Sequence, residues 1–121
     1  MCIRDSLAST SDLAVARELI AGYRTSEGAQ LRARATMLDF IDTHPADAHL
    51  RSLEVGHLTA SALLVDAAGE RALLTHHRKL ERWLQLGGHC DGDANLASVA
   101  LRECIEAVSY THLTLPTIYS V

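Results

Sequence analysis

Aromatic residues are scarce in this chain of 121 residues, because Phe, Trp and Tyr together make up only 4% of it. So few rings leave little material on which nucleic-acid bases could stack. Positive charge is also in deficit: 11 Lys and Arg stand against 15 Asp and Glu, which gives a net charge of −4. A protein that binds nucleic-acid phosphates needs clustered positive charge. The composition therefore predicts that nucleic acid is not a partner.

Cysteine is too sparse for a disulfide framework or a zinc pair of the Cys-x-x-Cys kind, since the chain has only Cys2, Cys90 and Cys104. Free thiols suit a reducing compartment, so we expect a cytoplasmic protein. No apolar run approaches the roughly 20 residues that span a bilayer, and the N-terminus lacks a signal peptide's apolar stretch. We therefore expect no membrane contact. At 48% hydrophobic and 21% charged, the chain has the composition of one globular domain.

The two ends of the chain differ in composition from the rest. Residues 108–121 contain no Asp, Glu, Lys or Arg, and they follow a helix-type segment with no capping Gly or Asn. Residues 1–6 and 108–121 resemble translated sequencing-adapter DNA, so we expect both to be non-native tails. The alternative for 108–121 is a genuine edge strand. The expected domain is then 7–107 and incomplete, with a helical part over 7–50 and strands plus a helix over 53–107.

Two helices are expected in the helical part. Capping residues at 9–12 precede apolar positions spaced three and four apart, and Gly22 marks the end of the first helix. A second helix is predicted over 29–42, and Pro45 stops it because proline has no N–H to donate. The residues expected to face inward are Leu13, Ala16, Leu19, Ile20, Tyr23, Leu31, Leu38 and Ile41, with Arg32, Arg34 and Asp39 outward.

The middle of the chain changes to strands. The predicted strands are 58–65, 71–76 and 82–86, with a hairpin turn at 66–69 in which Gly69 accepts a positive φ. The third strand is expected to end at Gly87-Gly88, and a polar loop over 89–95 leads into a helix from about Leu96 through Glu106. Helices combined with hairpin strands predict an α+β fold.

Two carboxylates on this last predicted helix suggest a site for a metal ion. Glu103 and Glu106 are three residues apart and therefore share one helix face. A hard divalent cation such as Mg²⁺ prefers carboxylate oxygen. The glycine-rich loop from Gly87 to Asp93 predicts a sharp backbone bend before the helix, and Asp91 and Asp93 add negative charge near its N-terminus. Taken alone, glutamates at this spacing usually mark a solvated helix face, and a Gly-Gly pair before a helix is usually an ordinary turn.

The stretch from Gly88 onward resembles the Nudix box, whose consensus is G-x5-E-x7-R-E-U-x-E-E-x-G-U. With Gly88 as its first glycine, Arg102 and Glu103 fall on the Arg-Glu pair and Glu106 on the first of the two later glutamates. Three further segments are similar to one Nudix subgroup: His-x-T-x-S at 57–61, His-x-K-L at 77–80 and W-x-x-x-G-G-H at 83–89. The departures from the box are Ala94, Cys104 and Ala107, and Ser109 and Tyr110 stand at its final Gly-U positions.

This resemblance implies a partial Nudix-type α/β/α sandwich with a mixed sheet and an N-terminal helical extension. It also implies a hydrolase that uses Mg²⁺ or Mn²⁺ to cleave the pyrophosphate of a nucleoside diphosphate derivative. By the same resemblance Glu103 and Glu106 are metal ligands, and Arg102 orients a box carboxylate through a bidentate pair. Gly88 brings the backbone close to the diphosphate. The residues expected to contact substrate phosphate are His57, Lys79 and His89, although ordinary hairpin and loop positions explain these histidines equally well.

Alanine at 94 and 107 leaves other functions open. Without a glutamate at Ala107 we expect weak metal binding and poor activity. One alternative is a Nudix-fold module that binds a nucleotide without cleaving it, and another is a non-functional product whose exposed sheet edge promotes aggregation. A zinc site built from His76, His77, His89 and Cys90 fits no standard structural-zinc spacing.

Overall fold

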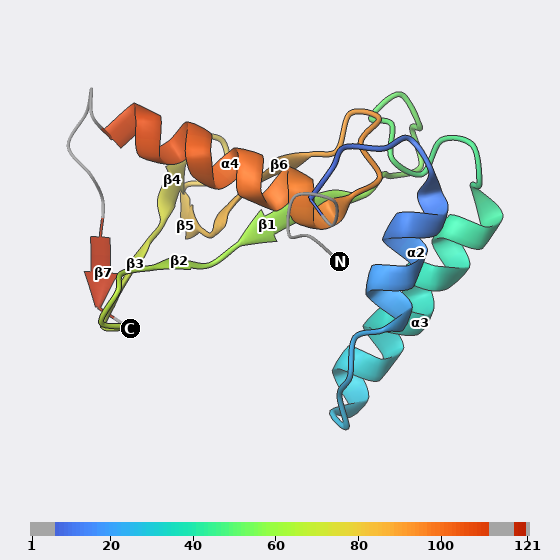
Figure 1. The fold of residues 1–121 in the computed structure, drawn as a ribbon, viewed down its shortest axis with the longest axis horizontal. Helices are drawn as coiled ribbons and strands as arrows, with labels where there is room; N and C mark the ends of the chain where they lie inside the picture. The colour runs from blue at the N-terminus through green and yellow to red at the C-terminus, as the bar shows by residue number, and fades with distance from the viewer. Residues whose placement is uncertain (1–6, 112–117, 121) are drawn as a thin grey trace. The chain divides into compact units, whose positions relative to one another are not determined.

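Helices and short strands share the part of the chain that the computed structural model describes, residues 7–111 and 118–120 (Figure 1). The helices are α2 (Leu13–Ala21), α3 (Gly28–Thr43) and α4 (Leu96–Thr111). The strands are β1 (Thr59–Ala62), β2 (Leu64–Val65), β3 (Arg71–Leu73), β4 (Thr75–His77), β5 (Arg82–Leu84), β6 (Leu86–His89) and β7 (Ile118–Ser120). This mixture confirms the predicted α+β class. Among the described residues, no helix has both the length and the apolar character needed to cross a membrane.

The chain divides into two compact units. The first contains residues up to 59 together with 89–98, and the second contains 60–88 and the residues from 99 onward. The change from helices to strands falls between α3 and β1, and the boundary between the units falls later, at the start of β1. The loop before α4 belongs to the first unit, and most of α4 belongs to the second.

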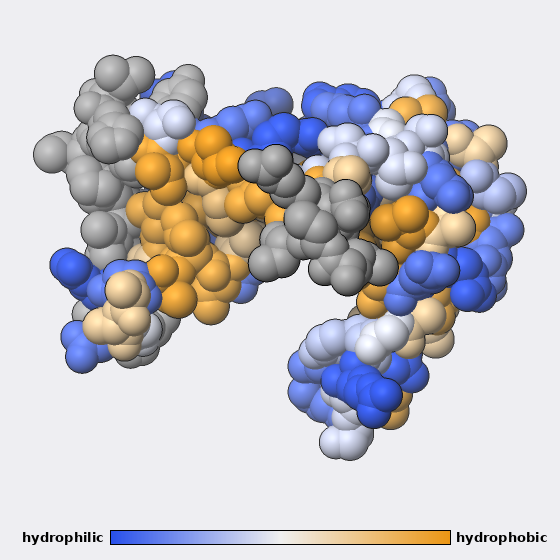
Figure 2. Space-filling model, viewed as in Figure 1, coloured by the Kyte–Doolittle hydropathy of each residue, from blue (hydrophilic) through white to orange (hydrophobic). Residues whose placement is uncertain are grey.

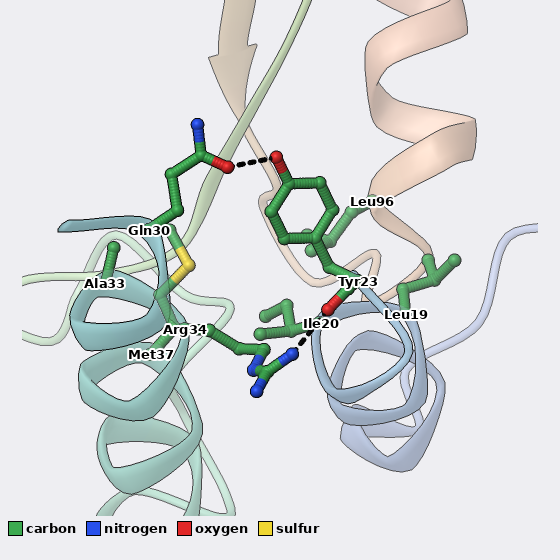
Figure 3. A pocket seen from close by; sticks show the side chains of 8 residues that line it. All are labelled: Leu19, Ile20, Tyr23, Gln30, Ala33, Arg34, Met37 and Leu96. Atoms are coloured by element: carbon green, nitrogen blue, oxygen red, sulfur yellow. Dashed lines mark hydrogen bonds between the residues drawn. The ribbon is translucent and has the colours of Figure 1, made fainter. Parts of the chain in front are cut away.

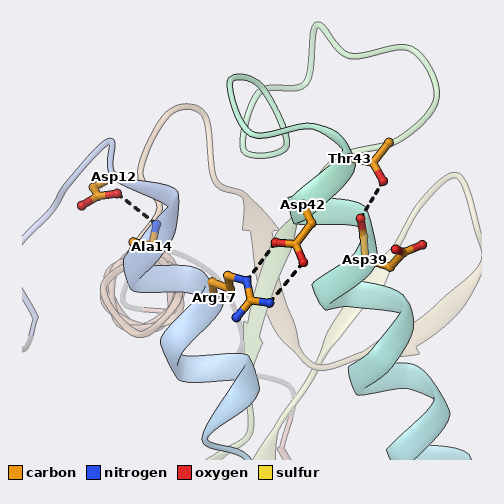
Figure 4. A network of polar contacts seen from close by, with 6 residues as sticks. All are labelled: Asp12, Ala14, Arg17, Asp39, Asp42 and Thr43. Carbon is orange, nitrogen blue, oxygen red and sulfur yellow. Dashed lines mark hydrogen bonds and ion pairs between the residues drawn. The ribbon is translucent and has the colours of Figure 1, made fainter.

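In the first unit, α2 and α3 lie side by side as a helical hairpin (Figure 1). The Asp12 carboxylate caps α2 by accepting a hydrogen bond from the Ala14 amide at 3.0 Å, as the capping pattern predicts. Across the hairpin, Arg17 donates two hydrogen bonds to the Asp42 carboxylate, at 2.8 and 3.1 Å (Figure 4). Because this pair is exposed, it orients the helices more than it stabilises them.

The apolar faces of α2 and α3 are only partly buried. Leu13, Ala16, Ile20 and Ile41 lie in the core, as predicted. The prediction is wrong for Leu19, Tyr23 and Leu31, which remain 47%, 51% and 37% exposed, and Arg34 is half-buried instead of outward. Helical periodicity identifies a face but not how far the neighbouring helix covers it.

The strand segments form three small sheets in the described residues, with orders β1-β6, β2-β3-β7 and β4-β5, rather than one mixed sheet. The predicted strand 58–65 breaks at Leu63 because β1 pairs with β6 whereas β2 pairs with β3. The turn before β3 is as predicted: Gly69 has φ +70°, and the Asp66 carboxylate accepts hydrogen bonds from the amides of Glu70 and Arg71. β2 and β3 are antiparallel, with Leu64 opposite Leu73.

The C-terminal segment continues the described structure beyond the expected boundary at residue 107. α4 runs through Thr111, and β7 pairs antiparallel with β3, with Ile118 opposite Leu73. An edge strand was the alternative for this segment, and residues 118–120 adopt it. The non-native origin of residues 108–121 stays a prediction, and the tail expected at 1–6 lies outside the described residues.

Two buried polar side chains fix the start of α4 in the first unit. The Asn95 side chain accepts a hydrogen bond from the Ser98 amide at 3.3 Å and donates one to the Ala8 carbonyl at 2.8 Å. The Asp93 carboxylate accepts from the Asn95 and Thr10 amides, at 2.9 and 3.2 Å. Burial by itself would raise the pKa of Asp93, but these amide donors outweigh it and hold that pKa below its usual range. The N-terminal segment is thereby attached to the helix start.

We predict that Asn95→Ala destabilises the protein by about 1–2 kcal/mol, because it removes the helix cap and leaves the Ala8 carbonyl without its donor. Chemical unfolding followed by circular dichroism measures this change. The control is Thr36→Ala, which removes an exposed hydroxyl that bonds only the Arg32 carbonyl of its own helix. Equal stability of the two variants would contradict a structural role for Asn95.

Candidate functional site

The two glycines before the predicted metal-binding helix do not bend the chain. Gly87 and Gly88 lie inside β6, and the left-handed conformations come later, at Asp91 (φ +50°) and Gly92 (φ +95°). The bend expected in the glycine-rich loop therefore lies at Asp91 and Gly92, whereas the strand end predicted at Gly87-Gly88 is wrong because β6 continues through His89. Aspartate is one of the few residues other than glycine that adopt this conformation readily.

Close approach of neighbouring groups explains both glycines instead. A Cβ atom at Gly87 would lie 2.8 Å from the carbonyl oxygen of Ala60 and equally near the Cβ of Ser61, in the adjacent strand β1. A Cβ atom at Gly88 would lie 2.7 Å from the Cδ of Glu103 and 3.1 Å from its Oε2. Real Cβ contacts are not this short, so a side chain at either position would displace its neighbour. The carboxylate of Glu103 therefore lies directly against the main chain of β6.

Glu103 occupies an unusual position on α4. It is half-buried, and it lies one helical turn after Val99, which is fully buried. Among the described residues none donates a hydrogen bond to its carboxylate or forms an ion pair with it. A carboxylate removed from water normally has such a partner. The Glu103 carboxylate therefore has no neutralising partner among the described residues.

The other side of α4 is apolar and exposed. Leu101, Ile105 and Val108 follow one another at spacings of four and three, with exposed fractions of 43%, 59% and 42%. Figure 2 shows apolar side chains gathered over this helix. In the second unit the described residues bury only three apolar side chains, Ala72, Leu86 and Val99. Its core is small, and the helix carries its carboxylate inward and aliphatic side chains outward.

Of the remaining predicted site residues, two histidines come together in the first unit. The rings of His57 and His89 have centroids 5.0 Å apart and planes inclined by 36°. His57 is half-buried, with its Nδ1 3.2 Å from the Leu58 carbonyl oxygen, and His89 is exposed. Lys79 is exposed in the turn between β4 and β5, in the second unit.

The acidic residues of the predicted metal site are both on α4. Glu106 is exposed, three residues beyond Glu103, and Arg102 is exposed beside them. Bidentate pairing of Arg102 with a box carboxylate stays a prediction. In the described part of the chain, no group of three or more His, Cys, Asp or Glu side chains is arranged to hold a metal ion. The histidines considered for zinc have other contacts, since His76 packs on Trp83 with ring centroids 4.7 Å apart.

One contact in the loop before α4 could not be found from the sequence. Arg51 donates two hydrogen bonds to the Asp91 carboxylate, at 2.7 and 2.6 Å, although the residues are 40 positions apart. The amide of Gly92 also donates to the His49 carbonyl at 3.0 Å. Together these hydrogen bonds hold Asp91 and Gly92, the two residues of the loop with left-handed backbone conformations. No local pattern marks Arg51 as the partner of Asp91.

Comparisons with known proteins add no relative, because no protein family, curated protein or solved structure matches this chain.

We predict that Gly87→Ala destabilises the protein by about 1–3 kcal/mol, because the new methyl group overlaps the Ala60 carbonyl oxygen and the main chain of Ser61 in β1. Gly88→Ala should cost less, because its methyl group meets only the carboxylate end of the flexible Glu103 side chain, which can turn away. Urea unfolding measures both changes. The control is Gly28→Ala, whose methyl group meets only the flexible end of Arg32. Equal losses at Gly87 and Gly88 would contradict the difference between the two contacts.

A second prediction concerns the ion pair of Arg51 with Asp91. Hydrogen bonding from Arg51 is the main cause that holds the pKa of Asp91 below its usual range, with smaller contributions from the charges of His89 and His57. Because the folded-state pKa is the lower one, the stabilisation exists above the unfolded-state pKa and is lost as pH falls through the folded-state value. NMR titration should find the pKa of Asp91 below about 3.9, the usual value for an aspartate. In the Arg51→Gln variant this pKa should rise towards that value. Arg17→Gln, the control, should leave it unchanged, and an ordinary pKa in the unsubstituted protein would contradict the pairing.

Proposed function

We propose that this chain is a Mg²⁺-dependent pyrophosphohydrolase of the Nudix type, with the strands, loop and α4 as part of an α/β/α sandwich. Its substrate class is a nucleoside diphosphate joined to another group. The observation that carries the proposal is the half-buried Glu103 carboxylate, which lies against Gly88 and receives no hydrogen bond from the described residues. The sequence motifs around Gly88 and the position of this carboxylate independently favour the same site.

The side chains of α4 suit magnesium in type and number. Mg²⁺ keeps several waters and is commonly held by one or two carboxylates together with substrate phosphates. Glu103 and Glu106 supply two carboxylates on neighbouring turns of one helix, so a third protein ligand is not required. Mn²⁺ takes the same oxygen ligands. When bound, the metal ion neutralises charge on the phosphate oxygens of the substrate.

The proposed role of each residue follows from its position. Glu103 holds the cation from its half-buried position, and the exposed Glu106 both contributes to the site and accepts the proton of the attacking water. Arg102 orients these carboxylates. By the same resemblance His57, His89 and Lys79 are the candidates for contact with substrate phosphate, and the rings of His57 and His89 are neighbours. Water adds to one phosphorus, the P–O–P bond breaks, and each product leaves with a phosphate end.

A second function is favoured by a specific observation. Ala94 and Ala107 stand where the Nudix box has glutamates. A Nudix-fold module that binds a nucleotide without cleaving it would have this composition. Such a module would be stabilised by a nucleotide and would release no product.

Activity towards ADP-ribose in Mg²⁺ tests the proposal and separates the two functions. The chain should cleave the compound slowly, and Ala107→Glu should raise the rate by about tenfold or more, since even groups that only support a metal ligand are commonly worth 10–100-fold. This substitution adds a carboxylate one turn after Glu103. Glu103→Gln should abolish cleavage in both backgrounds. Phosphate released from the products by an added phosphatase measures the rate.

Ser109→Glu is the matched control, because it adds the same charge at an exposed position on the same helix. It should not raise the rate. Thermal stabilisation by ADP-ribose without any product, also in Ala107→Glu, would instead support the binding module.

A further inference from the structure

A hollow in the helical hairpin of the first unit is separate from the proposed metal site. Its volume is about 390 Å³, within the roughly 300–1,000 Å³ usual for small-molecule sites. Leu19 and Ile20 line it from α2, Met37 lines it from α3, and Leu96 closes one side at the start of α4 (Figure 3). Leu19 and Met37 are 47% and 48% exposed, although both belong to the apolar lining. Aliphatic side chains around an open space of this size gain free energy when an apolar ligand fills it.

Three polar side chains converge on the same hollow. Figure 3 shows the Tyr23 hydroxyl joined to the Gln30 side-chain oxygen, and the Arg34 guanidinium lying between the two helices. Arg34 donates one hydrogen bond, from Nη1 to the Tyr23 carbonyl oxygen at 2.5 Å. This bond fixes the position of the guanidinium but leaves its charge uncompensated, because a carbonyl group is neutral.

The charge of Arg34 determines what kind of ligand fits. Within the described residues Arg17, Arg51 and Arg71 each form an ion pair, whereas no carboxylate pairs with Arg34. The residue is half-buried beside an aliphatic lining, where a positive charge without a counterion is unfavourable. A guanidinium has five N–H donors, so most of them remain for the planar two-oxygen end of an anion.

We propose that this hollow binds a small organic anion with a flat or branched apolar body and one monoanionic group such as a carboxylate. The apolar body lies between α2 and α3 against Leu19, Met37 and the Tyr23 ring, and the anionic group pairs with Arg34. The ligand is a free small molecule, because the lining is confined to one hollow and does not extend as a long face. This inference does not depend on the proposed hydrolase.

The test uses the fluorescent anion 8-anilinonaphthalene-1-sulfonate and its uncharged relative N-phenyl-1-naphthylamine, which is the same fluorophore without the sulfonate. The anion should bind saturably, one per chain. Arg34→Gln should weaken its binding by about tenfold, the usual worth of a charged hydrogen bond, and leave the uncharged probe unaffected. Arg34→Lys should keep most of the affinity for the anion.

Two further variants distinguish this site from other surfaces. Ala33→Leu fills the hollow and should abolish binding of both probes, whereas Arg32→Gln, a matched loss of charge on the same helix, should change neither. Circular dichroism checks that each variant keeps its helices. The proposal is overturned if Ala33→Leu binds the probes like the unsubstituted protein, or if Arg34→Gln weakens both probes equally.

Discussion

The contact between the Glu103 carboxylate and the main chain of Gly88 is the constraint on which the candidate site depends. A side chain at Gly88 would occupy the space of the carboxylate, which would then have to turn away from β6. The neighbouring Gly87 is more constrained, because a side chain there would overlap the main chain of β1. Gly87 and Gly88 therefore allow close packing of β6, whereas the loop bends at Asp91 and Gly92.

This arrangement gives α4 an unusual distribution of polarity. A surface helix normally buries an apolar stripe and exposes its charges. Here a carboxylate occupies the inner side, whereas Leu101, Ile105 and Val108 remain exposed on the outer side. A half-buried carboxylate without a hydrogen-bond donor is less favourable than a solvated one, and this is the physical basis of the proposed cation site. The small buried core of the second unit is consistent with a helix that is not placed by apolar contacts alone.

In the first unit, polar contacts between distant segments position the loop that precedes α4. Asp93 and Asn95 bind the backbone of residues 8–10, and Arg51 binds Asp91. The loop is consequently held from two directions, by the N-terminal segment and by the segment that follows α3. The same unit contains the His57–His89 pair and the hollow lined by Arg34. The helices that carry the hollow also bury apolar side chains, among them Ala16, Ile20 and Ile41.

The sequence by itself determined the features that depend on neighbouring residues: the Asp12 cap, the helix end at His44, the turn with Gly69 and the start of α4. These follow from backbone hydrogen bonds and capping groups within a few positions of each other. The placement of Glu103 and Glu106 on adjacent turns is equally local. The tertiary structure alone decided that Gly87 and Gly88 lie in a strand, that Leu19 and Tyr23 stay exposed, and that Arg51 finds Asp91. Burial and contacts between distant segments depend on which surfaces pack together, and no short stretch of sequence contains that information.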